Sequence, residues 1–148
     1  MKRKYMMCIT LLLMFILVVF VGATLMKQLS IQNTAKIETI GLKAYFEPQC
    51  VNEVAYLSWG MIQQQKNYTI YLKNVGSTNV TLTMTTTDWN PTNVSNYVSV
   101  VWNYNNEILL PNQVLQVTFT FTVTNEEAIV NEGIRDISWT IIITSIEA

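Results

Sequence analysis

The stretch that decides the fold is 114-VLQVTFTFTVT-124. From Leu115 onward, apolar and polar side chains alternate, and the apolar set is Leu115, Val117, Phe119, Phe121 and Val123. A period of two places the two sets on opposite faces of an extended strand. This stretch therefore predicts a half-buried strand of an antiparallel sheet.

The same alternation recurs in both directions along the chain. It is found in residues 37–46, 68–72, 80–85, 98–104 and 136–144, with 54–59 as a weaker candidate. Turn-forming residues such as Asn90-Pro91 separate these segments. No helical pattern of ten residues occurs after residue 36, so crossover helices for parallel strands are not expected. The pattern predicts an all-β, two-sheet antiparallel sandwich of about seven strands.

The amino-terminal segment differs sharply in composition. Three cations at positions 2–4 precede residues 5–26, which carry no charge. A helix of that length spans about 33 Å, enough for a hydrocarbon core of roughly 30 Å. The cations predict a single-pass anchor with a cytoplasmic amino end and an exported remainder. The alternative is a signal peptide that is cleaved near Ala23, which would leave a secreted protein.

These patterns divide the chain into three parts. Residues 1–26 form a transmembrane anchor or signal segment, residues 27–36 a polar stalk, and residues 37–148 an extracytoplasmic sandwich domain. The whole chain has 148 residues and a net charge of −1. The sandwich part holds four basic and ten acidic residues, which gives it a net charge of −6. Such a surface offers nothing to neutralise phosphates, so we expect no nucleic-acid partner.

No residue pattern indicates catalysis, a cofactor or a metal. The chain has no histidine, which excludes a histidine general base and a histidine-based zinc site. Acidic and amide residues gather within 125–132, but a solvated loop explains them better than a calcium site. Cys50 has no disulfide partner in the exported part and is expected to be a buried thiol or an intermolecular link. We therefore predict that the protein is not an enzyme.

Four tryptophans and three sequons are the remaining candidate features. Trp102 and Trp139 fall on the inward phase of their strands, which predicts core positions. Trp59 and Trp89 lie at strand ends, where an exposed ring would contact a partner or a sugar and a buried ring would close the sandwich. The N-x-S/T pattern marks three candidate glycosylation sites, about the number that chance supplies: Asn67, Asn79 and Asn93.

Several short segments resemble a known family. They are 45-YF-46 followed by Cys50, 58-SWG-60, 70-IYLKNVG-76, 86-TTDWNP-91, 101-VWNY-104 and 110-LP-111. In this order they resemble a family of small archaeal exported proteins with an amino-terminal membrane segment and one immunoglobulin-like β-sandwich. The resemblance covers about residues 37–148 and implies that fold, but it implies no activity and no catalytic residue. Similar sandwiches serve as adhesive, surface-layer-associated or filament-forming modules.

Three functions follow from these observations. The leading one is a non-enzymatic module with a structural or interaction role at the cell surface, anchored in the membrane by residues 5–26. The first alternative is a cleaved and secreted filament or surface-layer subunit that assembles by strand addition. The second alternative is a carbohydrate-binding module that uses exposed aromatic rings. The partners implied are a surface protein, a glycan or further copies of the chain.

Overall fold

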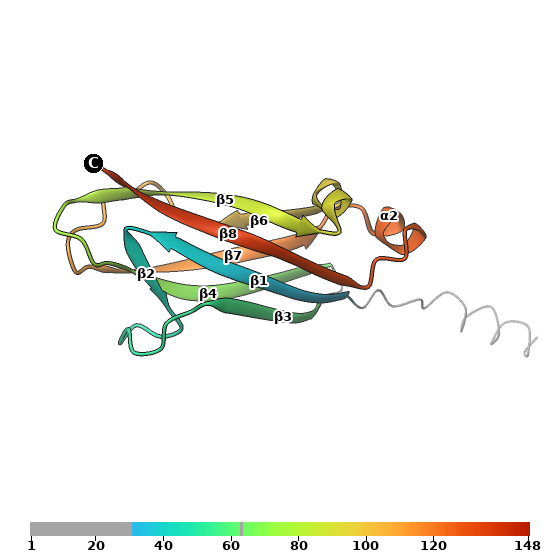
Figure 1. Ribbon diagram of the computed structural model, residues 1–148, viewed down its shortest axis with the longest axis horizontal. Coiled ribbons are helices and arrows are strands. Elements are labelled where there is room, and N and C mark those ends of the chain that lie inside the picture. The colour runs from blue at the N-terminus through green and yellow to red at the C-terminus, as the bar shows by residue number, and fades with distance from the viewer. Residues whose placement is uncertain (1–30, 63) are drawn as a thin grey trace, which may run out of the picture.

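The computed structural model describes residues 31–62 and 64–148, which form two four-stranded sheets packed face to face (Figure 1). The predicted anchor or signal segment, residues 1–26, lies outside these residues, as does the cleavage position near Ala23. In the part of the chain that is described, no helix has the length and apolar character needed to cross a membrane.

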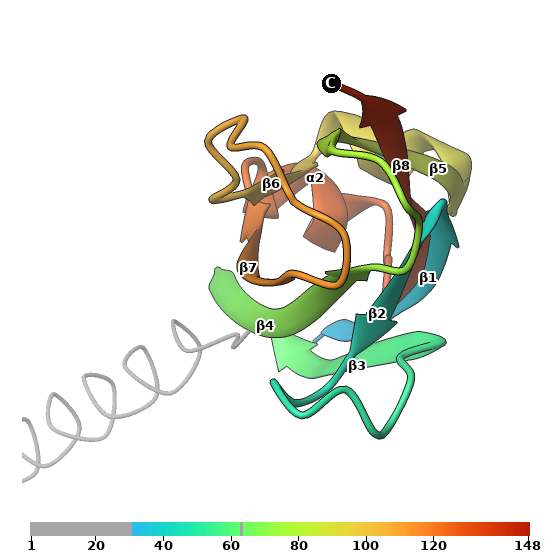
Figure 2. The ribbon, with the colours of Figure 1, turned by 90° about the vertical axis from the view of Figure 1, so that its left-hand side faces the viewer.

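Eight strands and two short helical segments make up the described residues. In chain order they are β1 (Ile31–Ile40), β2 (Leu42–Tyr45), β3 (Tyr56–Ile62), β4 (Gln65–Asn74), β5 (Val80–Asn90), the 3-10 helix η1 (Thr92–Asn96), β6 (Val98–Trp102), β7 (Val114–Val123), α2 (Glu126–Asn131) and β8 (Asp136–Glu147). One sheet has the order β3-β1-β8-β5 and the other β2-β4-β7-β6. Figure 2 shows the sheets as opposing layers.

The strand predicted at 114–124 is confirmed as β7. It lies in the middle of its sheet, and the side chains of Val117, Phe119 and Phe121 are at most 1% exposed. The alternating segments at 68–72, 80–85 and 136–144 are confirmed as parts of β4, β5 and β8, and the segment at 98–104 is confirmed up to Trp102, where β6 ends. The weaker candidate at 54–59 overlaps β3, which begins at Tyr56. Alternation of large apolar side chains therefore located most of the strands.

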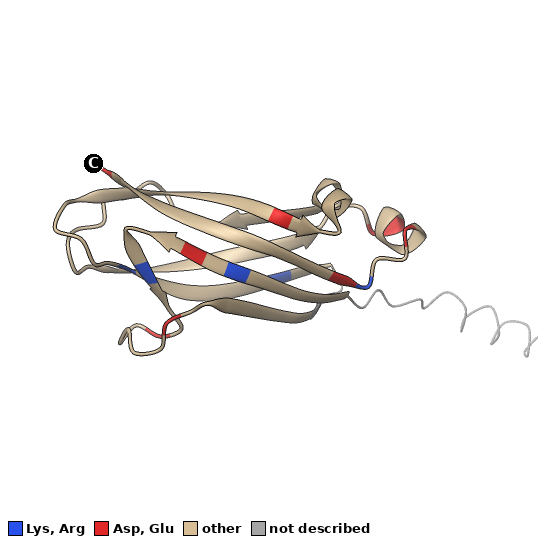
Figure 3. Cartoon of the chain, viewed as in Figure 1, with Lys and Arg blue, Asp and Glu red and all other residues tan. Residues whose placement is uncertain are grey.

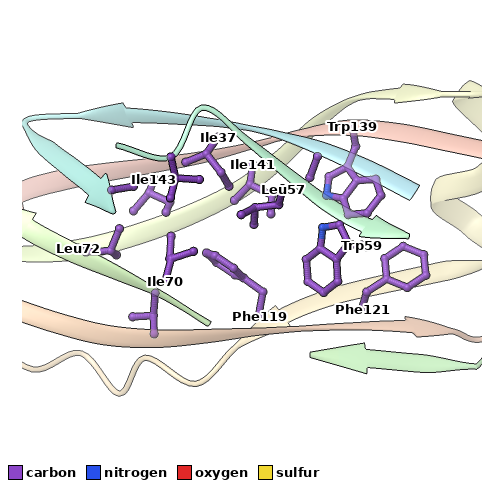
Figure 4. Packing of buried hydrophobic residues seen from close by; sticks show 14 of the residues in the cluster. Ile37, Leu57, Trp59, Ile70, Leu72, Phe119, Phe121, Trp139, Ile141 and Ile143 are labelled. Atoms are coloured by element: carbon purple, nitrogen blue, oxygen red, sulfur yellow. The ribbon is translucent and has the colours of Figure 1, made fainter. Parts of the chain in front are cut away.

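The core lies between the two sheets and takes side chains from both. Figure 4 shows Ile37, Ile141 and Ile143 on one side of it and Ile70, Leu72 and Phe119 on the other. Each of these side chains is nearly or fully buried. Burial of one such side chain contributes about 1.5–3 kcal/mol, so the facing surfaces hold the two sheets together.

The prediction of one continuous strand at 37–46 is wrong, because Gly41 separates two strands. β1 ends at Ile40 in one sheet, and β2 begins at Leu42 in the other. Gly41 makes this turn with a φ of 77°, in the left-handed region that favours glycine. A Cβ atom at this position would lie 2.0 Å from the Ser145 Oγ atom. The turn therefore needs a glycine both for its backbone angle and for space.

The predicted stalk is wrong for residues 31–36, which belong to β1, while residues 27–30 lie outside the described residues. Burial alternates along this strand, and its first three inward positions are Ile31, Asn33 and Ala35. Only Ile31 is a large apolar residue among these three. The sequence of this strand looked like a polar stalk because two of its inward residues are Asn33 and Ala35, whereas β7 has phenylalanines at inward positions.

The strand order is that of an immunoglobulin-like sandwich with one unusual pairing. The order β2-β4-β7-β6 corresponds to the A-B-E-D sheet of a constant-type domain, and β5-β8 corresponds to strands C and F. Strand G would follow F and pair with it, but here β1 takes that position beside β8. β1 runs parallel to β8, so the expectation of a purely antiparallel sandwich is wrong at this pairing. Residues 41–135 supply the long connection that parallel pairing requires.

Candidate functional site

β1 lies between two strands that come later in the chain. Nine of its residues are in parallel register with β8, from Gln32 opposite Asp136 to Ile40 opposite Thr144. On its other side, six residues pair with β3 in antiparallel register. We call the position between β8 and β3 the β1 site. Without β1, both neighbours would present an unpaired strand edge to solvent.

Backbone hydrogen bonds hold β1 at several points beyond the regular pairing. The Gln32 N–H donates to the Arg135 carbonyl at 3.0 Å, and the Ile37 N–H donates to the Ala55 carbonyl at 2.9 Å. At the carboxyl end of the strand, the Ser145 hydroxyl donates to the Ile40 carbonyl at 3.0 Å. The inward side adds little apolar area beyond the side chains of Ile31 and Ile37. Main-chain pairing therefore contributes a larger share of what holds β1 than of what holds a strand such as β7.

One inward residue of β1 fits its surroundings poorly. Asn33 is 2% exposed, and its amide nitrogen donates to the Ile31 carbonyl at 3.0 Å. Its Oδ1 atom is buried and has no hydrogen-bond partner among the described residues. The register with β3 also shifts between Asn33 and Thr34, next to Gly60, which has a φ of 61°. A buried polar atom without a partner costs about 1–3 kcal/mol, so this position weakens the attachment of β1.

The prediction that Trp59 offers a ring to a partner is wrong, because its side chain is 0% exposed. Trp59 lies on the inward phase of β3, and its ring centroid is 6.0 Å from that of Trp139 and 6.1 Å from that of Phe121. Figure 4 shows these three rings gathered at the same end of the core. The alternative given for Trp59, a ring that packs inside the sandwich, is correct.

Trp89 is half-buried and stacks on Trp139, with ring centroids 5.1 Å apart and an angle of 13° between the planes. Trp139 itself is 2% exposed, which confirms its predicted core position. Trp102 is also half-buried and packs against the core, parallel to the Phe119 ring. Of the two tryptophans proposed to contact a partner, only Trp89 keeps part of its ring accessible.

All three candidate glycosylation residues are exposed, but their surroundings differ. Asn67 lies on β4, and Asn79 lies in the connection before β5. Asn93 lies in η1, where its amide nitrogen donates to a carboxylate oxygen of Glu132. The Asn93 amide is thus already engaged within the protein. Glycosylation at the three positions stays a prediction.

The acidic segment at 125–132 is not the loop that we expected, because it contains α2. Asn125 caps this helix by accepting a hydrogen bond from the Ala128 N–H at 3.0 Å. Glu126 and Glu127 occupy the first turn, where negative charge interacts favourably with the helix dipole. Glu132 accepts a hydrogen bond from the Tyr97 hydroxyl at 2.5 Å, which raises the pKa of Tyr97 above its usual value. The described residues contain no group of three potential metal ligands.

Cys50 is half-buried in the connection between β2 and β3, so the expectation of a fully buried apolar thiol is wrong. Its backbone has a φ of 56°, and its sulfur lies 3.6 Å from the Pro48 carbonyl oxygen. The turn that contains it is organised by the Glu47 carboxylate, which accepts hydrogen bonds from the N–H groups of Val51 and Asn52. An intermolecular link through Cys50 stays a prediction.

No protein-family model and no curated protein matches this chain. Among solved structures, the chain is similar to the ASH or PapD-like domain (PapD-like domain 7) of human CEP192, with a TM-score of 0.33 and 12% sequence identity. The match covers 77% of this chain and 83% of that one. The assignment to an immunoglobulin-like fold rests on the strand order of the two sheets. The resemblance to archaeal exported proteins stays a prediction.

Proposed function

We propose that the protein is a non-enzymatic module that works at the outer surface of the cell and is held in the membrane by residues 5–26. The charge step between positions 2–4 and the uncharged segment supports the anchor. The sandwich supports an interaction role through its strand edges. Figure 3 shows its charged residues scattered over strands and loops rather than gathered in one patch.

The observation that carries this proposal is the β1 site. β1 is the first strand of the described residues, and it forms nine register pairs with β8 and six with β3. Such pairing uses main-chain groups and needs no special side-chain chemistry, which is how strand addition joins proteins. The module would therefore interact through strand pairing, and the anchor would present it outside the membrane.

Fractionation of cells that express the full chain tests the anchor. We expect the protein to stay with membranes after a high-salt or carbonate wash, with residues 37–148 open to external protease. An intact-mass measurement of the native protein gives the second readout. A product that begins near Thr24 and is recovered without membranes would overturn the anchor and support the secreted alternative.

A second candidate function is a secreted subunit that assembles by strand addition after cleavage near Ala23. The position of β1 favours it, because cleavage there would leave only residues 24–30 ahead of this strand. The carbohydrate-binding alternative has lost support, since Trp59 is buried and Trp89 is partly covered by Trp139. A flat platform of exposed rings, which sugar binding would need, is therefore not supported by these two residues.

A further inference from the structure

We infer that β1 of one copy fills the β1 site of a second copy, so that chains join by exchanging this strand. The inference rests on the proposed interaction role and names its partner, which is another copy of this chain. The interacting groups are the backbone edges of β8 and β3 on one copy and both edges of β1 on the other. Three features of the molecule support it.

The first feature is that the β1 site does not depend on which chain supplies the strand. Its contacts are the register pairs with β8 and β3 together with the inward side chains of Ile31 and Ile37. A strand from a second copy rebuilds all of these contacts without a new interface. Exchange of an identical element is for this reason a low-cost route from monomers to assemblies.

The second feature is the connection that would have to open. On its carboxyl side, β1 is joined to the rest of the sandwich through Gly41 alone, and the next residue already belongs to the opposite sheet. Short connections of this kind favour exchange, because extending them separates a strand from its own domain. Gly41 is flanked by strand residues on both sides, Ile40 and Leu42, so an extended Gly41 would join two segments that already have extended backbone.

The third feature is the weak side-chain attachment of β1. The buried Oδ1 atom of Asn33 lacks a partner among the described residues, and Ala35 offers only a methyl group. Two exposed charged residues, Lys36 and Glu38, lie on the outward face and form an ion pair. Less apolar surface is therefore exposed when β1 leaves its site than when a strand such as β7 leaves, which lowers the barrier to exchange.

Mixing two single-cysteine variants of the full chain in detergent tests the exchange. Cys8→Ser and Cys50→Ser are present in both, one chain carries Glu38→Cys, and the other carries Ile142→Cys with a tag of different mass. These two positions are register partners between β1 and β8. After joint unfolding, refolding and oxidation, a mixed disulfide forms where β1 of one chain lies beside β8 of the other.

The matched control uses two register partners from strands that should not exchange. Asn67→Cys on β4 and Thr120→Cys on β7 are placed in separate chains of the same cysteine-free background. We expect the β1–β8 pair to give about tenfold more mixed disulfide than the β4–β7 pair, because β1 is joined to the sandwich through one residue on its carboxyl side, whereas β4 and β7 are inner strands of the opposite sheet with longer connections on their carboxyl sides. Equal yields from the two pairs would overturn the inference.

Two changes at the connection sharpen the result. Gly41→Val should raise the yield of mixed disulfide several-fold, because its Cβ and its φ oppose the closed turn but not an extended strand. Inserting Gly-Ser-Gly after Gly41 should lower the yield, since a longer connection lets β1 return to its own site. A folded Gly41→Val protein without increased yield contradicts the exchange. If Gly41→Val does not fold, the comparison of the β1–β8 and β4–β7 cysteine pairs in chains with an unchanged Gly41 tests the exchange.

The two proposals fail separately in these experiments. A chain that stays with membranes but gives no mixed disulfide above the control overturns strand exchange and leaves the anchored module standing. A chain that gives the mixed disulfide but is recovered without membranes, beginning near Thr24, overturns the anchor and keeps the exchange. The partner is then a second copy of a secreted protein.

Discussion

β7 and β1 are both inner strands, each paired on both edges, but different forces hold them. β7 presents Val117, Phe119 and Phe121 to the core, all at most 1% exposed. β1 presents an amide and a methyl group at two of its inward positions, Asn33 and Ala35. β1 still buries Ile31 and Ile37, but it buries less apolar side chain than β7 and depends relatively more on main-chain pairing with its neighbours. A strand that depends on main-chain pairing, such as β1, forms the same contacts in its own copy and in a second copy, so exchange costs it little free energy.

The largest expected effect is on the inward face of β7. Phe121→Asp would bury a carboxylate without a partner and should cost several kcal/mol, out of a total stability of roughly 5–15 kcal/mol. Thr120→Asp, one residue away on the other face, should cost about 1 kcal/mol or less. Urea unfolding of residues 28–148 measures both. Equal losses would show that the two faces of β7 are assigned wrongly.

The next largest effect is expected in the hydrogen-exchange rates of β1 and β7. The amide of Ile37, which donates to the Ala55 carbonyl, should exchange at least about tenfold faster than the amides of Val117 and Phe119. The reason is that we expect β1, together with the edge strand β3 that pairs with it, to open without the rest of the sandwich, whereas β7 should open only with global unfolding. Native-state exchange followed by NMR gives the comparison. Equal protection of these amides would mean that β1 and β7 open together.

A smaller effect is expected at the inward amide of β1. Asn33→Val removes a buried oxygen without a partner and should raise the unfolding free energy by about 1 kcal/mol. Asn74 is the matched control, since it is equally buried but its amide donates to the carbonyls of Thr78 and Leu109 and accepts from Gly76. Asn74→Val should cost about 2 kcal/mol or more. Similar losses at both positions would show that Asn33 is not a weak point.

The same contrast explains what the sequence could predict. Large apolar side chains at a period of two are a local signal, and they located β7 and most other strands. A fainter signal of the same kind was present for β1, because Ile31 and Ala35 are in phase with Ile37. The break at Gly41 was missed because the residues on either side of it both favour extended backbone. Local pattern thus finds strands more readily than their ends.

Pairing and burial depend on partners that a local pattern does not contain. The parallel pairing of β1 with β8 joins residues more than one hundred positions apart, such as Gln32 and Asp136. The burial of Trp59 follows from its packing against Trp139 and Phe121, which come from two other strands. For the same reason, the β1 site was not predictable as a candidate site, although strand addition was among the alternatives.

The smallest effect is expected on the outward faces, where the strands also differ. β7 carries no charge there, whereas Lys36 and Glu38 on β1 form an ion pair in which both side chains are nearly half exposed. The hydrogen bond from Lys36 to Glu38 raises the pKa of Lys36 above 10.5. Any stability that this pair contributes is therefore fully present below pH 10.5 and is lost as the pH rises through the raised pKa.

Water and salt screen so exposed a pair, so Lys36→Met should leave the urea midpoint at pH 7 unchanged within error. Unfolding curves of both proteins at pH 7 and above pH 11 measure the effect and its sign. Thr118→Met on β7 is the control for added apolar surface. A loss at pH 7 that disappears above pH 11 would show that the ion pair fixes β1 in its site. In that case, main-chain pairing would no longer explain the attachment of β1, and exchange of the strand would become sensitive to salt.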